Sequence, residues 1–304
     1  MSLFLTDLQA EWAVFVGTGE MGVLLGALAA GLLLSVACGV IGSYVVVRRI
    51  SYIAGGIAHC VLGGMGAAIY CRGALGWSWV DPIWGRQWLT PMTGAVFAAL
   101  IAAALIGVVS MRFRQREDTV ISAVWAVGMS AGVLFIWATP GYQQHLMGYL
   151  FGDILMVGGE HLAVIAVLDV VVVGVCLGLY KQFLGVCFDE EFARTRGLRT
   201  DAYYMLLLCL AAVTVVLLAA IVGVVMVIAL LTLPAATAGQ CTRRLWRMML
   251  LAGVLCAAET ATGLAISYGP GLSSGATIII LSAGVFLAVL ALKALARAVR
   301  PRRQ

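Results

Sequence analysis

Residues 42–59 read GSYVVVRRISYIAGGIAH, and two apolar runs meet in this stretch at Arg48 and Arg49. A pair of arginines between two apolar segments is typical of a short cytoplasmic hairpin between membrane spans. His59 lies ten residues beyond Arg49, inside the second apolar run. At about 1.5 Å per residue this places it roughly 15 Å deep, near the midplane of a hydrocarbon core about 30 Å thick. An ionisable side chain at that depth indicates a functional role.

The composition indicates a polytopic membrane protein with little soluble mass. Of its 304 residues 63% are hydrophobic and 11% are charged, whereas soluble domains carry about 25% charged residues. The net charge of +5 comes from short basic clusters between apolar runs, which is the positive-inside pattern and indicates no nucleic-acid partner. No basic residue precedes Arg48, so we expect no signal peptide. The eight cysteines form no CxxC pair, which argues against a zinc knuckle or a disulfide framework.

The apolar runs predict an all-α, polytopic membrane bundle of eight or nine spans in a single transmembrane domain, 1–304. The uncharged run 202–242 would reach about 60 Å as one helix, so we expect it to turn back, with breaks at Gly223 and Pro234. The count is eight if this run does not cross twice. We further expect an interfacial helix around Trp12, an outer half-helix at 142–158 and a cytoplasmic segment at 181–201. The expected spans are 21–47, 51–71, 91–111, 119–138, 160–180, two within 202–242, 248–268 and 275–296.

Two acidic residues share the predicted depth of His59. Asp169 lies twelve residues before Lys181, and Glu259 lies twelve residues after Arg247, so each is about 18 Å from the cytoplasmic face. An imidazole and two carboxylates at one depth suit Zn²⁺, Mn²⁺ or Fe²⁺. In the alternative interpretation each acid is protonated or hydrogen-bonded to a neighbouring helix and has no function.

The cytoplasmic segment 188–199 is acidic at its start and basic at its end. This order matches the dipole of a short helix, and Gly197 is a plausible stop. The segment is either a solvated loop or a docking helix for a soluble partner, and its residues alone favour neither. No GxxxxGK[ST] motif occurs, so the chain is not expected to hydrolyse ATP by that route.

Taken together, the order and spacing of several short motifs resemble the ABC-3 family, the permease subunits of bacterial zinc, manganese and iron ABC importers. The resemblance covers nearly the whole chain. The motifs are Gly42-Ser43, Arg48-Arg49-Ile50-Ser51-Tyr52, Ala58-His59, Glu117-Asp118-Thr119, Leu150-Phe151-Gly152-Asp153-Ile154-Leu155, Phe188 to Arg194, Gly197-Leu198, Val222-Gly223-Val224, Leu233-Pro234-Ala235-Ala236-Thr237-Ala238 and Ser273-Ser274-Gly275-Ala276-Thr277.

The resemblance implies a homodimeric permease in the bacterial inner membrane, with separate cytoplasmic ATPase subunits and an external metal-binding protein. It implies no permanently bound cofactor, only a transported Zn, Mn or Fe ion, with zinc slightly favoured. His59 would belong to the ion path. Segment 189–197 would contain the helix that couples the permease to the ATPase, including Asp189, Glu190, Ala193, Arg196 and Gly197.

One position departs from the family pattern. Much of the family has an Asp four residues before this His, and here that position is Gly55, followed by Gly56. Either Glu259 or Asp169 replaces the missing acid, or the ion passes with fewer ligands. The glycine pair would also let a neighbouring backbone approach closely. The alternatives are a permease for an iron chelate or cobalamin, a proton-driven carrier using Asp169 and Glu259, and a membrane scaffold without transport.

Overall fold

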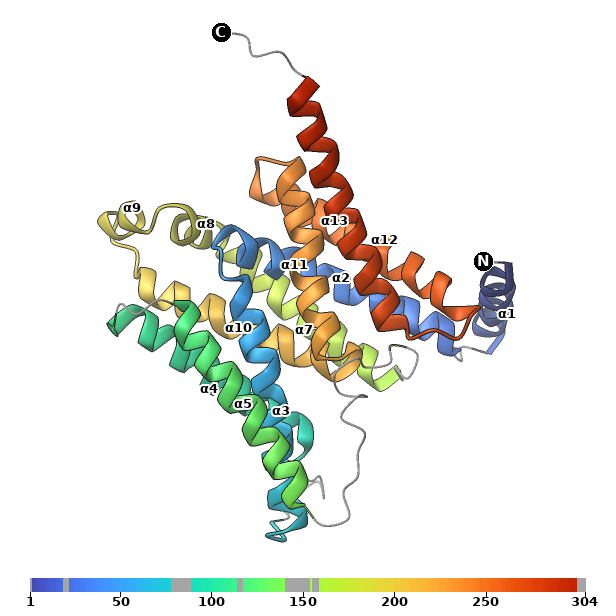
Figure 1. Cartoon of the computed structure of the whole chain (residues 1–304), viewed down its shortest axis with the longest axis horizontal. Coiled ribbons are helices and arrows are strands. Elements are labelled where there is room, and N and C mark those ends of the chain that lie inside the picture. The colour runs from blue at the N-terminus through green and yellow to red at the C-terminus, as the bar shows by residue number, and fades with distance from the viewer. Residues whose placement is uncertain are drawn as a thin grey trace. The chain divides into compact units, whose positions relative to one another are not determined.

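The computed structural model describes residues 2–18, 22–77, 89–113, 117–139, 154 and 159–299, and these ranges are helical, with no strand. Figure 1 shows the helices in chain order. Eight described helices are long and apolar enough to cross a membrane, and a bent pair at Leu162–Gly178 and Tyr180–Phe188 raises the count to nine. The prediction of an all-α membrane protein with eight or nine spans is confirmed. The half-helix expected at 142–158 lies outside the described residues, apart from Ile154.

The helices divide between two compact units, each made of separate stretches of the chain. The first unit comprises Met1–Arg49, Asp153–Gly174 and Ala229–Gln304, and the second comprises Ile50–Gly152 and Val175–Ile228. Because the chain alternates between them, neither unit corresponds to a continuous part of the sequence.

In the first unit, α2 (Val23–Val47) packs along α12 (Leu245–Tyr268), which also contacts α13 (Ser274–Val299). Glycines bring these helices together, because a Cβ on Gly39 of α2 would lie 2.8 Å from the Cα of Gly253 in α12. Such small residues are what allow membrane helices to pack closely. The remaining helices with residues in this unit are α1 (Ser2–Thr18), α7 (Gly159–Gly178) and α11 (Val224–Cys241).

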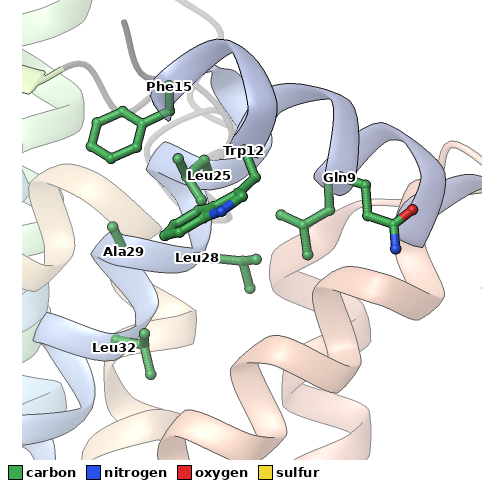
Figure 2. A pocket seen from close by; sticks show the side chains of 8 residues that line it. Gln9, Trp12, Phe15, Leu25, Leu28, Ala29 and Leu32 are labelled. Atoms are coloured by element: carbon green, nitrogen blue, oxygen red, sulfur yellow. The ribbon is translucent and has the colours of Figure 1, made fainter. Parts of the chain in front are cut away.

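Helix α1 contains Trp12, where the sequence predicted an interfacial helix. Glu11 accepts hydrogen bonds from the backbone N–H groups of Leu24 and Leu25, at 3.2 and 2.8 Å, and so caps the start of α2. The Tyr268 hydroxyl of α12 donates to Asp7 at 3.0 Å. Figure 2 shows Trp12 reaching from α1 toward α2, where an apolar pocket of about 540 Å³ lies between the two helices. Three hydrogen bonds to two acidic side chains of α1 therefore hold this helix in place, with an apolar pocket beside it.

In the second unit, α3 (Ser51–Gly73) lies against both α4 (Pro91–Phe113) and α5 (Glu117–Ala138), as Figure 1 also shows. Glycines mediate both contacts. Gly64 of α3 meets Gly94 of α4, and a Cβ on Gly63 would lie 2.7 Å from the Gly128 carbonyl oxygen of α5. The unit also holds α8 (Tyr180–Phe188), α9 (Glu190–Thr195) and α10 (Thr200–Val222).

The long uncharged run is interrupted at only one of the two expected positions. Helix α10 ends at Val222, and Gly223 follows with a φ of +84°, a conformation that L side chains rarely adopt. Helix α11 then continues through Pro234 to Cys241 without a break, so the prediction that the helix breaks at Pro234 is wrong. A proline removes one backbone donor, and membrane helices tolerate that loss where neighbouring groups satisfy the freed carbonyl.

The span expected at 160–180 is followed directly by another helix, α8. Helix α8 begins at Tyr180 and runs to Phe188, after a bend of 71° from the helix before it. The first part of the expected cytoplasmic segment is therefore helical.

We expect Gly64→Ala to destabilise the protein, because the new Cβ would collide with the Gly94 backbone and lie 2.5 Å from the Ala98 Cβ. Overpacking of this kind costs about 1–3 kcal/mol, and it would appear as a lower thermal unfolding midpoint in detergent. Gly174→Ala is the matched control, since a Cβ there meets nothing within 4 Å. Equal midpoints for the two variants would contradict the close α3–α4 contact.

Candidate metal-binding residues and coupling segment

The arginine hairpin leads directly into the helix that carries His59. Helix α2 ends at Val47 and α3 begins at Ser51. The turn between them is tight, and Arg49 has a positive φ of 63°. The sequence interpretation of residues 48–50 as a short turn between two helices therefore agrees with the structure.

His59 is buried in α3, at 7% exposure, and its ring is stacked on the indole of Trp125 from α5. The ring centroids are 4.5 Å apart and the planes are inclined by 12°. Among the described residues the Nδ1 atom of His59 has no hydrogen-bond partner. A metal ion binds imidazole through a lone pair in the ring plane, so stacking on the ring face leaves coordination possible.

Cys60 follows His59, but its thiol is already engaged. The Sγ atom donates to the Val124 carbonyl of α5 at 3.2 Å. It also packs against Gly128, where an added Cβ would lie 2.6 Å from the sulfur. This contact favours a packing role for Cys60 over a role as a soft metal ligand.

The two glycines before His59 have different surroundings. A Cβ on Gly55 would lie 3.6 Å from both Ile228 and the Trp125 ring, which is ordinary van der Waals contact. A Cβ on Gly56 would lie 2.7 Å from the Ile121 Cγ2 atom of α5. Gly56 is therefore the residue that the approach of α5 requires, whereas the backbone around Gly55 has room for a Cβ.

Asp169 of α7 and Glu259 of α12 are both buried in the first unit, at 6% and 3% exposure. No described residue forms a hydrogen bond with either carboxyl group. Their neighbours differ. Asp169 lies within electrostatic range of Cys38, whose thiol faces Cys256, whereas Glu259 lies beside Ser282 of α13 without reaching hydrogen-bond geometry.

His59 belongs to the second unit and the two acids to the first, so neither unit holds all three groups. Within the described ranges, no set of three or more His, Cys, Asp or Glu side chains is arranged to hold a metal ion. A shared station of His59, Asp169 and Glu259 stays a prediction.

The segment 189–197 forms the capped helix α9. Asp189 precedes it and accepts a hydrogen bond from the Phe192 N–H at 2.9 Å. At the other end Gly197 has a φ of +80°, and the Leu198 N–H donates to the Ala193 carbonyl at 3.2 Å. This is the glycine-dependent helix stop that the sequence suggested.

Ala193 fixes α9 to the rest of the second unit. It is buried at 2% exposure, and a Cβ on Gly185 of α8 would lie 3.3 Å from its side chain. Arg194 contacts Asp201 at 3.0 Å and Thr200 at 3.3 Å, both at the start of α10, and Glu190 within α9 at 3.4 Å. Packing and polar contacts therefore orient α9 against α8 and α10.

Phe188 and Phe192 are largely exposed, and the Arg196 guanidinium lies 5.1 Å from the centre of the Phe192 ring. The sequence pattern indicated a role for the charges of this segment and none for the two phenylalanines. Phe188 ends α8 and Phe192 lies in α9, so no helical spacing in the sequence marked the two residues together. Trp125 was also missed, and its only signal is a tryptophan far from the expected membrane interface.

The chain is similar in sequence to membrane proteins of metal transport systems. The sequence profile of the ABC 3 transport family matches residues 20–293. A probable metal transport system membrane protein of Chlamydia trachomatis serovar D is 33% identical, over 85% of each chain. The manganese transport system membrane protein MntC of Listeria innocua is 31% identical, over 89% of this chain and 90% of its own.

The fold is also similar to a solved structure, PsaBC from Streptococcus pneumoniae in complex with Fab. The TM-score is 0.74 at 26% identity, and the match covers 91% of this chain and 94% of the other. The profile match, the relatives and the shared fold agree over most of the sequence. The chain belongs to the ABC 3 transport family.

Proposed function

We propose that this chain is the membrane-spanning permease subunit of an ATP-driven importer for a free divalent metal ion. One observation carries the proposal within this family. His59 is buried in a membrane span with an Nδ1 atom that has no partner among the described residues. A buried polar atom without a partner is costly unless it serves a ligand. A divalent cation is the ligand that an imidazole lone pair suits.

The proposal includes the assembly that the family implies. The chain forms one permease domain, 1–304, and pairs with a second copy in the bacterial inner membrane. Cytoplasmic ATPase subunits hydrolyse ATP, and an external metal-binding protein delivers the ion. Transport follows alternating access, in which the ATPase moves the coupling helix and the path opens to one side and then the other.

The surface of α9 supports a docking role. A single-turn helix that is capped at both ends and packed against two neighbours is held in one orientation. The exposed side chains of this segment are Phe188 at the end of α8, Phe192 in α9 and Arg196 directly after α9. Aromatic and arginine side chains are enriched in protein interfaces, so this surface suits contact with the ATPase.

The cargo is Zn²⁺, Mn²⁺ or Fe²⁺. The family resemblance favours zinc slightly, and the manganese transport protein of Listeria innocua supports manganese. A competition experiment decides the cargo. Proteoliposomes holding the permease, its ATPase and its binding protein receive the three free ions and a ferric chelate together with ATP. We expect accumulation of one free ion, whereas uptake of the chelate alone would overturn the proposed cargo.

A further inference from the structure

Trp125 occupies a gap in the surface of α3 that Gly55 leaves between two aromatic side chains. Tyr52, Gly55 and His59 are spaced by three and four residues, so they lie along one face of the helix. Because Gly55 has no side chain, the indole of Trp125 reaches the α3 backbone there, 3.6 Å from where a Cβ would stand. The same ring lies 5.8 Å from Tyr52 and 4.5 Å from His59, measured between ring centroids.

The stack restricts the imidazole without using its nitrogens. With planes inclined by only 12°, the indole covers one face of the ring and opposes its rotation. Stacking does not use the ring plane, and Nδ1 has no partner among the described residues. An imidazole that binds a cation also gains positive character, and indole is the aromatic face that attracts positive charge best. The contact therefore strengthens when an ion is bound.

We propose that Trp125 is a positioning residue of the ion path, which holds His59 ready to coordinate and stabilises its ion-bound form. The proposal rests on the proposed function, because it assigns Trp125 a role in ion binding by His59. It also explains what a glycine at position 55 allows. Without a side chain there, the Trp125 ring occupies the space beside His59 that an acidic side chain would otherwise take.

The test measures Mn²⁺ binding to the purified transporter complex without ATP, and ATP-driven Mn²⁺ uptake by the same complex in proteoliposomes. Trp125→Leu and Trp125→Met remove the aromatic ring and keep an apolar side chain, whereas Trp125→Phe keeps an aromatic ring that can stack on His59. Trp137→Leu is the matched control, because Trp137 lies on the same helix and is 85% exposed. Thermal unfolding of each complex identifies variants that fail to fold.

We expect Trp125→Leu and Trp125→Met to weaken Mn²⁺ binding about tenfold, which corresponds to about 1.4 kcal/mol. The maximal uptake rate should change much less, because only ion binding loses a contact. Trp125→Phe should bind within about twofold of the wild type, given the aromatic face that it keeps, and Trp137→Leu should match the wild type.

Wild-type affinity in Trp125→Leu or Trp125→Met would overturn the inference, and so would a Trp125→Phe variant as weak as these two. These outcomes differ from a failure of the proposed function, in which the wild-type complex itself would show no ATP-driven ion uptake.

Discussion

His59→Ala is expected to reduce ATP-driven uptake of the transported ion by about tenfold or more, at an unchanged amount of permease in the membrane. Loss of even an indirect contact at a metal site commonly costs about 10–100-fold in affinity, and this variant removes the group that we propose to coordinate the ion. The measurement is the initial rate of ion uptake into proteoliposomes that hold the complete complex.

Cys60→Ala is the matched control for the His59 variant. Cys60 is the next residue, it is also buried, and its thiol donates to a backbone carbonyl of α5. Its truncation disturbs the same α3–α5 contact and leaves the imidazole in place, so we expect most of the transport to remain. Equal rates in the His59→Ala and wild-type complexes would remove His59 from the ion path.

Gly197→Pro is expected to uncouple ATP hydrolysis from transport. Gly197 has a φ of +80°, whereas proline fixes φ near −65°. The substitution also removes an N–H group that donates to the Arg194 carbonyl at 3.0 Å. Both effects distort the end of α9, so we expect ion uptake to fall about tenfold or more while the dimer still assembles and hydrolyses ATP. The measurement is the number of ions accumulated per ATP hydrolysed.

Gly197→Asn distinguishes distortion of α9 from a general effect of changing this position. Asparagine tolerates a positive φ better than other L residues, so this variant should keep most of the coupling. Retained coupling in Gly197→Pro would count against placing the docking helix at 189–197.

Glu190→Lys tests the same surface through its charge. A guanidinium nitrogen of Arg194 lies 3.4 Å from Glu190 Oε1, and both side chains are partly exposed to solvent. Exposed ion pairs are weak, so the loss of this pair should cost no more than about 1 kcal/mol of stability. We therefore expect an assembled permease with reduced ion uptake per ATP hydrolysed. Unchanged coupling would show that Glu190 lies outside the contact with the ATPase.

The sequence predicted the features that depend on local patterns. Arg48 and Arg49 marked a hairpin because charges are excluded from spans. Gly223 fits the turn after α10 because a positive φ favours glycine. Pro234 was misinterpreted because the cost of a lost donor depends on neighbouring groups that the sequence does not specify. The helix after the bend, α8, was not predicted as a separate element, since its apolar pattern is short.

The environment of His59 depends on contacts between distant parts of the chain. His59 lies buried in the helix where the sequence predicted a span, and its depth in the membrane stays a prediction. Depth along a helix does not identify what lies beside a residue. Trp125 contacts His59 from α5, and how α3 and α5 pack decides which α5 side chains face His59. Likewise the sequence marked Gly55 and Gly56 as a pair, whereas only the packing of Ile121 distinguishes them.

The energy source of ion uptake tests the central claim most directly. Proteoliposomes holding the permease with its ATPase and binding protein are supplied with Zn²⁺, Mn²⁺ and Fe²⁺ separately, with and without ATP, and with the proton gradient intact or collapsed. We predict that one free divalent ion accumulates only with ATP, and equally in both gradient conditions. Accumulation without ATP that disappears when the gradient collapses would contradict the account and identify a proton-driven carrier.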